Sequence, residues 1–247
     1  MLRTFRYGKK LPVIDDRTLK MEKYLQPSLP MLPESYSVLD RILPSFPGQT
    51  VETLFPMDGN DTKGCCTIAT VAHAETGFSG LIGRIYVMPS RDVVKAYLKL
   101  GDGQDNGLVW LDVMKYWRNH GFNGHKIFAF TSLELRNHDS LKRAIMLFGG
   151  APIGFRVQKD AIKDFRNHTP WTPGRTEGGG HEVFATGWTP DWIELLTWGS
   201  RQRATWPWYD EMPDEASAVL PGEAQNGGFT PGVDYATLQQ DLTAINT

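Results

Sequence analysis

The order of the amphipathic patterns along the chain is the feature that most constrains its fold. Apolar residues recur at helical spacing in several stretches between residues 66 and 148. Strand-like runs dominate the second half, at 182–188, 192–198 and 217–220, and 189–191 reads as the turn between the first two. This segregation predicts an α+β fold, in which a helical half packs against an antiparallel β-sheet half.

The ends of the predicted helices follow from local signals. Ser90 precedes an apolar stretch at helical spacing and is expected to cap that helix. Asp139 or Ser140 is expected to open a later helix, which Gly149 and Gly150 end.

Prolines divide the chain into three parts. Residues 1–54 are predicted to form a Pro-rich N-terminal arm, because proline interrupts helix interiors and central strands. Apolar residues are frequent there, so we expect the arm to pack on something, with one short helix near residues 37–42. Residues 55–221 form the predicted main domain, and 222–247 a C-terminal tail with a short amphipathic helix.

Composition excludes several classes of protein. The 247 residues carry a net charge of −2, with 40% hydrophobic and 22% charged residues, as in an ordinary soluble domain. Neither a nucleic-acid nor a membrane partner is expected, and no secretion signal is visible. Two adjacent cysteines do not make a disulfide framework, so we expect free thiols and a reducing compartment. The expected location is the cytoplasm, or a virion if the chain is phage-encoded. No cofactor and no metal site are expected.

Cys66 is the candidate nucleophile. The only two cysteines, Cys65 and Cys66, stand where a polar turn runs into an apolar helical stretch. A thiol at a helix N-terminus feels the positive end of the helix dipole, which favours the nucleophilic thiolate. The alternative is that the cysteine is a small buried apolar residue.

His181 is the candidate base. It follows three glycines and starts a predicted strand, where it is well placed to meet a helix N-terminus from the other half. His73 lies seven residues after Cys66, about 10 Å along the helix, which is too far for a hydrogen bond. The alternative for His181 is a strand-end histidine without a catalytic role.

These residues, taken in order, resemble the papain-like cysteine peptidase superfamily. Asn60 and Gly64 stand six and two residues before Cys66, where that family has Gln and Gly. His181 begins a strand ending in Gly187-Trp188, and a later strand ends in Trp198-Gly199. The resemblance covers about residues 55–220. The chain also resembles a group of small papain-like proteins from bacteria and tailed phages.

The resemblance implies roles for particular residues. Cys66 and His181 would be the catalytic pair, and Asn60 the oxyanion donor. Asn106, Gly107 and Gly180 would line the substrate groove.

The third catalytic position departs from the family. The family has Asn two residues before the Trp to orient the histidine, but this chain has Leu196 there. Thr197 is adjacent and is expected to point to the opposite strand face. The possible residues to orient or flank His181 are nevertheless Thr197, Glu194 and Trp198. A backbone carbonyl, or Asp191 if the strand bulges, could also orient the ring.

Three functions remain open from the sequence. The first is a thiol hydrolase, a cysteine peptidase acting on a peptide or protein. The second is a catalytically inert papain-like structural or binding module, for example a virion component, assembling as a homo-oligomer or in a particle through its arm and tail. The third is a redox role for Cys65 and Cys66. The arm is either a pro-segment, which would cover the groove, or a permanent strap.

Overall fold

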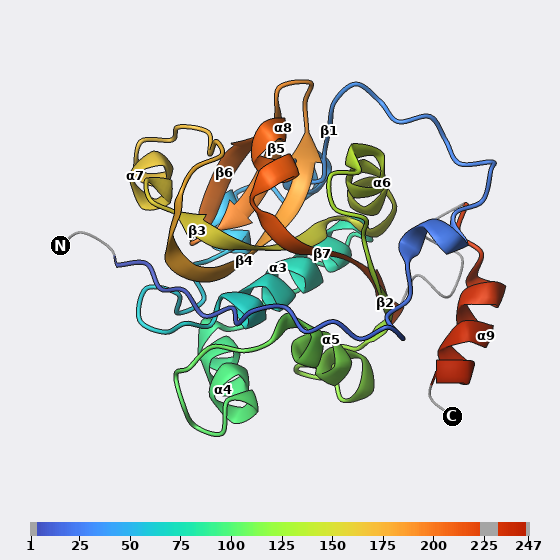
Figure 1. Ribbon diagram of the computed structural model, residues 1–247, viewed down its shortest axis with the longest axis horizontal. Helices are drawn as coiled ribbons and strands as arrows, with labels where there is room; N and C mark the ends of the chain where they lie inside the picture. Colours follow the sequence, from blue (N-terminus) through green and yellow to red (C-terminus); the bar gives the residue numbers. More distant parts are fainter. Residues whose placement is uncertain (1–3, 223–231, 246–247) are drawn as a thin grey trace.

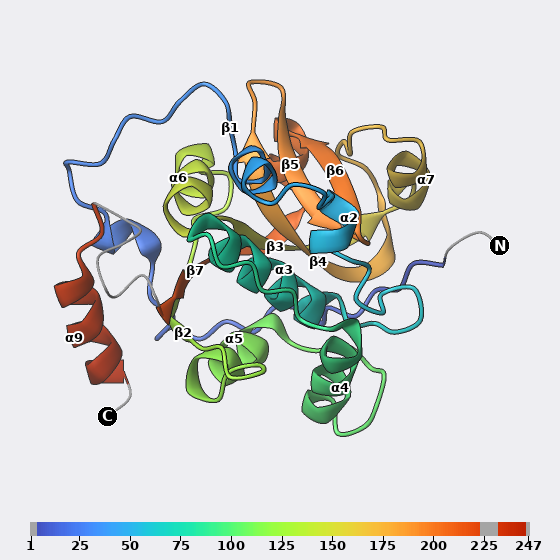
Figure 2. The ribbon, with the colours of Figure 1, turned by 180° about the vertical axis from the view of Figure 1, so that it is seen from behind.

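A computed structural model describes residues 4–222 and 232–245 of the chain. The helices gather against one side of an antiparallel sheet, with further short helices around the sheet (Figures 1 and 2). This arrangement confirms the predicted α+β fold.

The helical half is built around α3 (Cys66–Leu81), which runs through the middle of the molecule. Nearly all its residues are buried, because the sheet covers one side and α4 (Ser90–Leu100) and α5 (Trp110–Asn119) lie near it on the other. The remaining helices are α1 (Leu39–Ile42), α2 (Val51–Leu54), α6 (His138–Phe148), α7 (Ala161–Arg166), α8 (Trp206–Glu211) and α9 (Tyr235–Ile245), with single 3-10 turns at Met21–Tyr24 and Leu43–Ser45.

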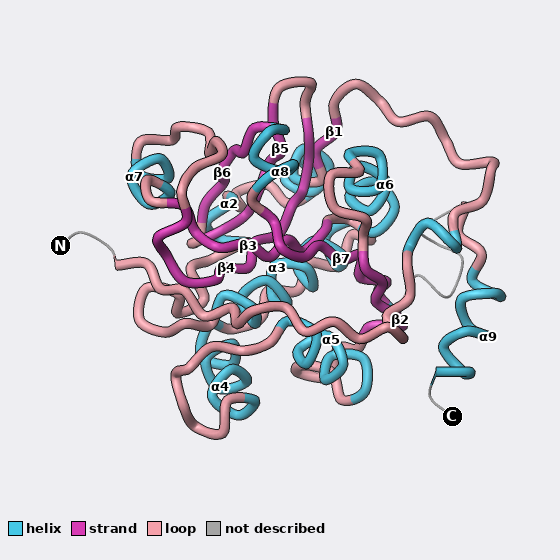
Figure 3. Tube along the Cα trace, in the orientation of Figure 1, coloured by secondary structure: helices cyan, strands magenta, loops and turns pink. Residues whose placement is uncertain are grey.

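The sheet has the strand order β2-β7-β3-β4-β5-β6, and β1 pairs with β4 outside this path. All the pairings between these strands are antiparallel. Figure 3 marks the strands along the chain in magenta. The strands are β1 (Tyr36–Ser37), β2 (Ile127–Ser132), β3 (Ala151–Gln158), β4 (Thr176–Trp188), β5 (Trp192–Thr197), β6 (Ser200–Thr205) and β7 (Pro213–Pro221).

Two predicted helix starts are wrong by a few residues. Pro89 occupies the N-cap of α4, and the Ser90 hydroxyl donates instead to Asp58 Oδ1 at 2.9 Å. Asn137 caps α6 by accepting from the Ser140 N–H at 3.1 Å. At α4 a tertiary contact takes the Ser90 hydroxyl away from capping, whereas at α6 the local Asn137 cap precedes the predicted residues.

The second part of the arm belongs to the core. Val38, Leu39 and Ile42 are fully buried, and β1 extends the sheet next to β4. The predicted short helix is α1. The domain boundaries at residues 54 and 221 stay predictions, and part of the predicted tail lies outside the described residues.

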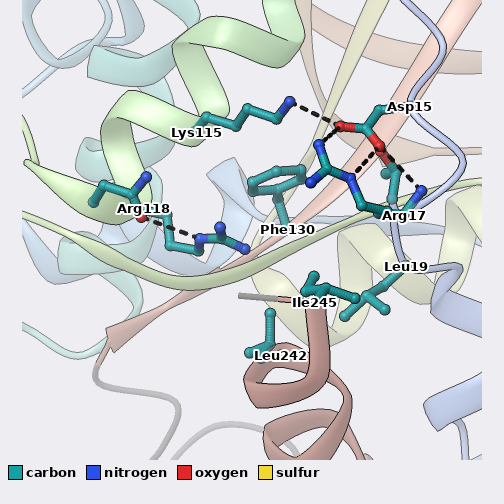
Figure 4. A pocket seen from close by; sticks show the side chains of 10 residues that line it. Asp15, Arg17, Leu19, Lys115, Arg118, Phe130, Leu242 and Ile245 are labelled. Carbon is teal, nitrogen blue, oxygen red and sulfur yellow. Dashed lines mark hydrogen bonds and ion pairs between the residues drawn. The ribbon is translucent and has the colours of Figure 1, made fainter. Parts of the chain in front are cut away.

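The first part of the arm crosses the molecule as an extended chain over the N-terminal end of α3 (Figure 1). Farther along, the Asp15 carboxylate accepts from Lys115 Nζ on α5 at 2.9 Å and from the Arg17 guanidinium at 2.8 Å (Figure 4). Arg17, and then Lys115, hold the pKa of Asp15 far below its usual range. Leu242 and Ile245 of α9 line the same cavity, so the tail helix lies close to the arm.

Candidate active site

Cys66 is the first residue of α3 and is buried. The helix N-terminus favours a thiolate there, but burial opposes any charge and raises the pKa of the thiol to about 11. Backbone hydrogen bonding from Glu182 and Gly8 acts in the other direction. Glu182 follows His181 in the chain, so the sulfur lies beside the backbone that carries the candidate base.

His181 lies in β4, fully enclosed. Its Nε2 is 2.7 Å from the Thr197 hydroxyl oxygen, and its Nδ1 is buried with no hydrogen-bond partner among the described residues. The Trp198 indole stacks on the imidazole, with ring centroids 4.6 Å apart and planes 22° from parallel. Burial lowers the pKa of His181 to about 3, so the ring is neutral in this arrangement.

Among the candidates to orient the ring, Thr197 is the one that contacts His181, although strand alternation was expected to turn it away. The reason is the register of β4 against β5. Leu196 pairs with Phe184, which lies three positions from His181, so Leu196 belongs to the opposite sheet face from His181. The next residue, Thr197, then shares the histidine's face.

A tight hairpin holds this geometry. Thr197 pairs with Ser200, so only Trp198 and Gly199 form the turn. Their φ angles are +49° and +73°, as a two-residue type I′ turn requires. The turn presents the Thr197 hydroxyl and the Trp198 ring to the same imidazole.

The acidic candidates do not reach His181. The Glu194 carboxylate accepts hydrogen bonds from Ser37, Thr186 and Arg201. Asp191 is exposed in the turn between β4 and β5. His73, farther along α3, donates from Nε2 to the Pro56 carbonyl oxygen at 3.0 Å.

Asn60, the candidate oxyanion donor, lies buried in the turn before α3. Its Oδ1 has no hydrogen-bond partner in the described part of the chain, and its backbone carbonyl accepts from the Arg6 N–H at 2.8 Å. Cys65 contrasts with Cys66, because its thiol donates to the Asp58 carbonyl at 3.2 Å and packs in the hydrophobic core.

Residues 4–10, called here the groove segment, run between Gly180 on one side and Leu108 on the other. The N–H groups of Gly8 and Lys9 lie 3.2 and 3.0 Å from the Gly180 carbonyl. The Leu108 N–H donates to the Gly8 carbonyl, and the Lys10 N–H donates to the Leu108 carbonyl, each at 2.8 Å. The groove thus binds an extended peptide through backbone hydrogen bonds on both sides.

Two of the predicted groove residues form these walls. A Cβ on Gly107 would lie 2.4 Å from the Gly8 carbonyl oxygen, and one on Gly180 would lie 2.3 Å from that of Lys9. Glycine is needed at both positions because the bound strand approaches the backbone so closely. Asn106, the third predicted groove residue, is exposed.

The groove segment covers the catalytic candidates. A Cβ on Gly8 would lie 1.5 Å from the carbonyl oxygen of Gly64, two residues before Cys66. The Tyr7 ring lies edge-on to His181, with centroids 6.0 Å apart, and the Phe5 ring contacts Trp198. The segment therefore excludes water from the site.

Asp105 is a positioning residue that sequence reasoning did not single out. Its Oδ1 accepts from the Gly64 N–H at 2.9 Å and from the Tyr97 hydroxyl at 2.7 Å. The Tyr97 hydroxyl also accepts from the Gly107 N–H. One carboxylate thus ties the turn before Cys66 to the groove wall. The only sequence signal for this role was an aspartate in a Gly-rich loop. Aspartate is common in such loops because its side chain stabilises turns.

Residues 4–222 and 232–245 hold no group of three or more His, Cys, Asp or Glu side chains arranged to bind a metal ion. None of their helices combines the length and the apolar character needed to cross a membrane.

Comparison with solved structures finds extensive likeness at low identity. Xylellain, a cysteine protease from Xylella fastidiosa, is 14% identical with a TM-score of 0.67, over 89% of this chain and 98% of that one. ProCathepsin B S9 from Trypanosoma congolense is 12% identical with a TM-score of 0.53, over 89% and 86%. Procathepsin L 3 from Tenebrio molitor larval midgut is 10% identical with a TM-score of 0.56, over 88% and 76%. No family model and no curated protein matches the sequence.

Proposed function

Because the chain has the papain-like fold, we propose that it is a thiol hydrolase, a cysteine peptidase whose groove its own residues 4–10 keep closed. The observation that carries the proposal is the extended strand held by backbone hydrogen bonds at Gly180 and Leu108, directly over Cys66. A groove that holds this strand is shaped to hold a peptide substrate in the same way.

The proposed chemistry uses the residues around that strand. His181 takes the thiol proton at Nδ1 while its Nε2–H donates to Thr197 Oγ1. The Cys66 thiolate attacks the scissile carbonyl carbon, and the oxyanion is held by the Asn60 side-chain amide and the Cys66 N–H. His181 then returns the proton to the leaving amine. Water hydrolyses the thioester, which frees the carboxylate product and the thiol.

Closure explains why both groups are neutral in the structure. Burial under the groove segment raises the pKa of Cys66 and lowers that of His181, so no thiolate–imidazolium pair forms. Departure of the segment admits water, which removes the desolvation that opposes the charged forms. In this proposal the arm blocks the groove until it leaves, and is not a permanent part of the closed site.

The test uses Gly8→Ala in the full chain, because the new Cβ cannot fit against Gly64 and should displace the segment. Cys66 alkylation by iodoacetamide is followed against pH in a Cys65→Ser background. We expect rapid labelling well below pH ~8.5, the ordinary thiol pKa, and loss of this rapid phase when His181→Ala is added.

The matched control is Gly174→Ala, where a Cβ makes only ordinary van der Waals contacts and no backbone strain arises. It should label as slowly as the parent chain. Labelling of Gly8→Ala that follows an ordinary thiol titration, with or without His181, would contradict the catalytic pair.

The second candidate function is an inert papain-like module in an assembly, such as a phage particle. Its support is the apolar surface of the arm, where Leu11, Val13, Ile14 and Met31 are exposed by 54–91%. A regular oligomer that buries these residues, combined with slow labelling of Gly8→Ala, would favour this function over the peptidase. The third candidate, a redox role for Cys65 and Cys66, predicts that Cys65→Ser impairs activity as much as Cys66→Ser.

A further inference from the structure

Lys9 follows the glycine that crosses Cys66, and its side chain points inward. The side chain is fully buried, which is rare for lysine. Its Nζ forms ion pairs with Asp214 Oδ1 at 2.7 Å and with Glu215 Oε1 at 2.8 Å, both on β7. Burial opposes the charge, but the surrounding carboxylates outweigh it and raise the pKa of Lys9.

A third carboxyl group, that of Glu182, lies beside the same ammonium. Its side chain is 2% exposed, and neither oxygen has a hydrogen-bond partner within residues 4–222 and 232–245. Burial, and then the nearby Glu215, raise the pKa of Glu182 well above its usual value. Three acidic groups therefore surround one cation, and one of them, Glu182, directly follows the candidate base His181 in β4.

The backbone leaves room for that cation. A Cβ on Gly154 in β3 would lie 2.1 Å from Lys9 Cε and 2.8 Å from Glu182 Oε2. A side chain at this position would fill the space that the ammonium occupies. Asp214 and Glu215 also line a cavity of about 450 Å³, together with Met114 and Leu133. The carboxylates that bind Lys9 therefore border this cavity as well.

We propose that Glu182, Asp214 and Glu215 form a specificity pocket for a lysine or arginine side chain of the substrate, which Lys9 occupies while the groove is closed. The inference rests on the proposed function. A substrate strand paired with Gly180 and Leu108 would deliver one side chain to the place where Lys9 now lies. An apolar side chain there would bury the carboxylates without a cation, which is costly.

Binding tests the pocket without requiring catalysis. The full chain with Gly8→Ala and Cys66→Ala is titrated calorimetrically with an acetylated peptide amide of residues 4–11. A second peptide carries norleucine in place of Lys9, which keeps the alkyl chain and removes the ammonium. We expect the lysine peptide to bind at least about tenfold more tightly, a difference of about 1.4 kcal/mol.

Three controls sharpen this result. Asp214→Asn and Glu215→Gln should each reduce the preference for lysine, whereas Glu211→Gln, an exposed carboxylate on α8, should leave it unchanged. If Gly8→Ala does not fold, Lys9→Ala in the full chain vacates the same pocket. Equal dissociation constants for the two peptides would overturn the proposal.

Cleavage separates this inference from the proposed function. The full chain with Gly8→Ala and an intact Cys66 is given fluorogenic blocked dipeptide amides, with Lys or norleucine at the first or second residue before the scissile bond. A preference for lysine at one position is expected. Equal cleavage of both series would refute the pocket and leave the hydrolase. Tighter lysine binding without any cleavage would refute the hydrolase and leave the pocket.

Discussion

The two halves of the N-terminal arm are held in the fold by different forces. Residues 36–54 contribute Val38, Leu39 and Ile42 to the core, where each side chain is fully enclosed. The groove segment, residues 4–10, contributes backbone hydrogen bonds, one buried lysine and the partly buried rings of Phe5 and Tyr7. Apolar burial provides most of the stability of a fold, whereas each hydrogen bond exchanged with water adds little. One Pro-rich stretch thus combines a part packed into the core with a part that the proposed function requires to be released.

The largest expected effect falls on the permanent half. Ile42→Ala should lower the free energy of unfolding by roughly 2–5 kcal/mol, because it leaves a cavity where Ile42 packs against Gly80 of α3. Gly8→Ala should lower it by less than Ile42→Ala does, since water can replace the hydrogen bonds and ion pairs of the displaced segment but not the lost core packing.

Urea unfolding followed by tryptophan fluorescence measures both values. Met31→Ala, in the same arm and 91% exposed, is the control and should change stability by less than about 0.5 kcal/mol. A loss in Gly8→Ala as large as that in Ile42→Ala would end the distinction between the two halves.

The next effect concerns the pH dependence of stability. The unfolded chain protonates His181 near its ordinary pKa of 6.5, but burial keeps the folded pKa at about 3. The unfolded state therefore binds the extra proton, and stability falls as the pH drops below 6.5. Between pH 6.5 and pH 5 the loss attributable to His181 should be about 2 kcal/mol.

The difference between the parent chain and His181→Gln, measured by urea unfolding at several pH values, isolates this contribution. Gly8→Ala should reduce it, because water then reaches the imidazole. An acid response that is identical in parent and His181→Gln would show that the groove segment does not bury the histidine.

The smallest effect concerns Thr197. Thr197→Val keeps the shape of the side chain but removes the hydroxyl that lies at His181 Nε2. In the Gly8→Ala chain, whose groove is open, we expect this change to cost about 1 kcal/mol of transition-state stabilisation, or roughly fivefold in kcat/KM. Thr197→Ser should restore it. The pH profile of kcat/KM should change in Thr197→Val, and a change confined to stability would indicate that the hydroxyl has only a structural role.

Local sequence patterns predicted much of the fold for reasons visible in the structure. Helical spacing placed α3 to α6, and alternating or apolar runs placed β2 to β5 and part of β7. The patterns missed α7, β6 and α8, which are six residues each and lack a clear period. The start of α6 was displaced because Asn137, Asp139 and Ser140 are all residue types that cap helices.

The sequence by itself determined the fold class, the position of Cys66 at a helix start and of His181 in a strand, because these depend on residue spacing. Only the tertiary structure decided which neighbour contacts the histidine, since the pairing of Leu196 with Phe184 fixes the sheet face of Thr197. It also decided that residues 4–10 fill the groove and that Lys9 meets Asp214 and Glu215, about two hundred residues away in the chain. Such contacts leave no periodic signal, because they join segments whose separation in the sequence is arbitrary.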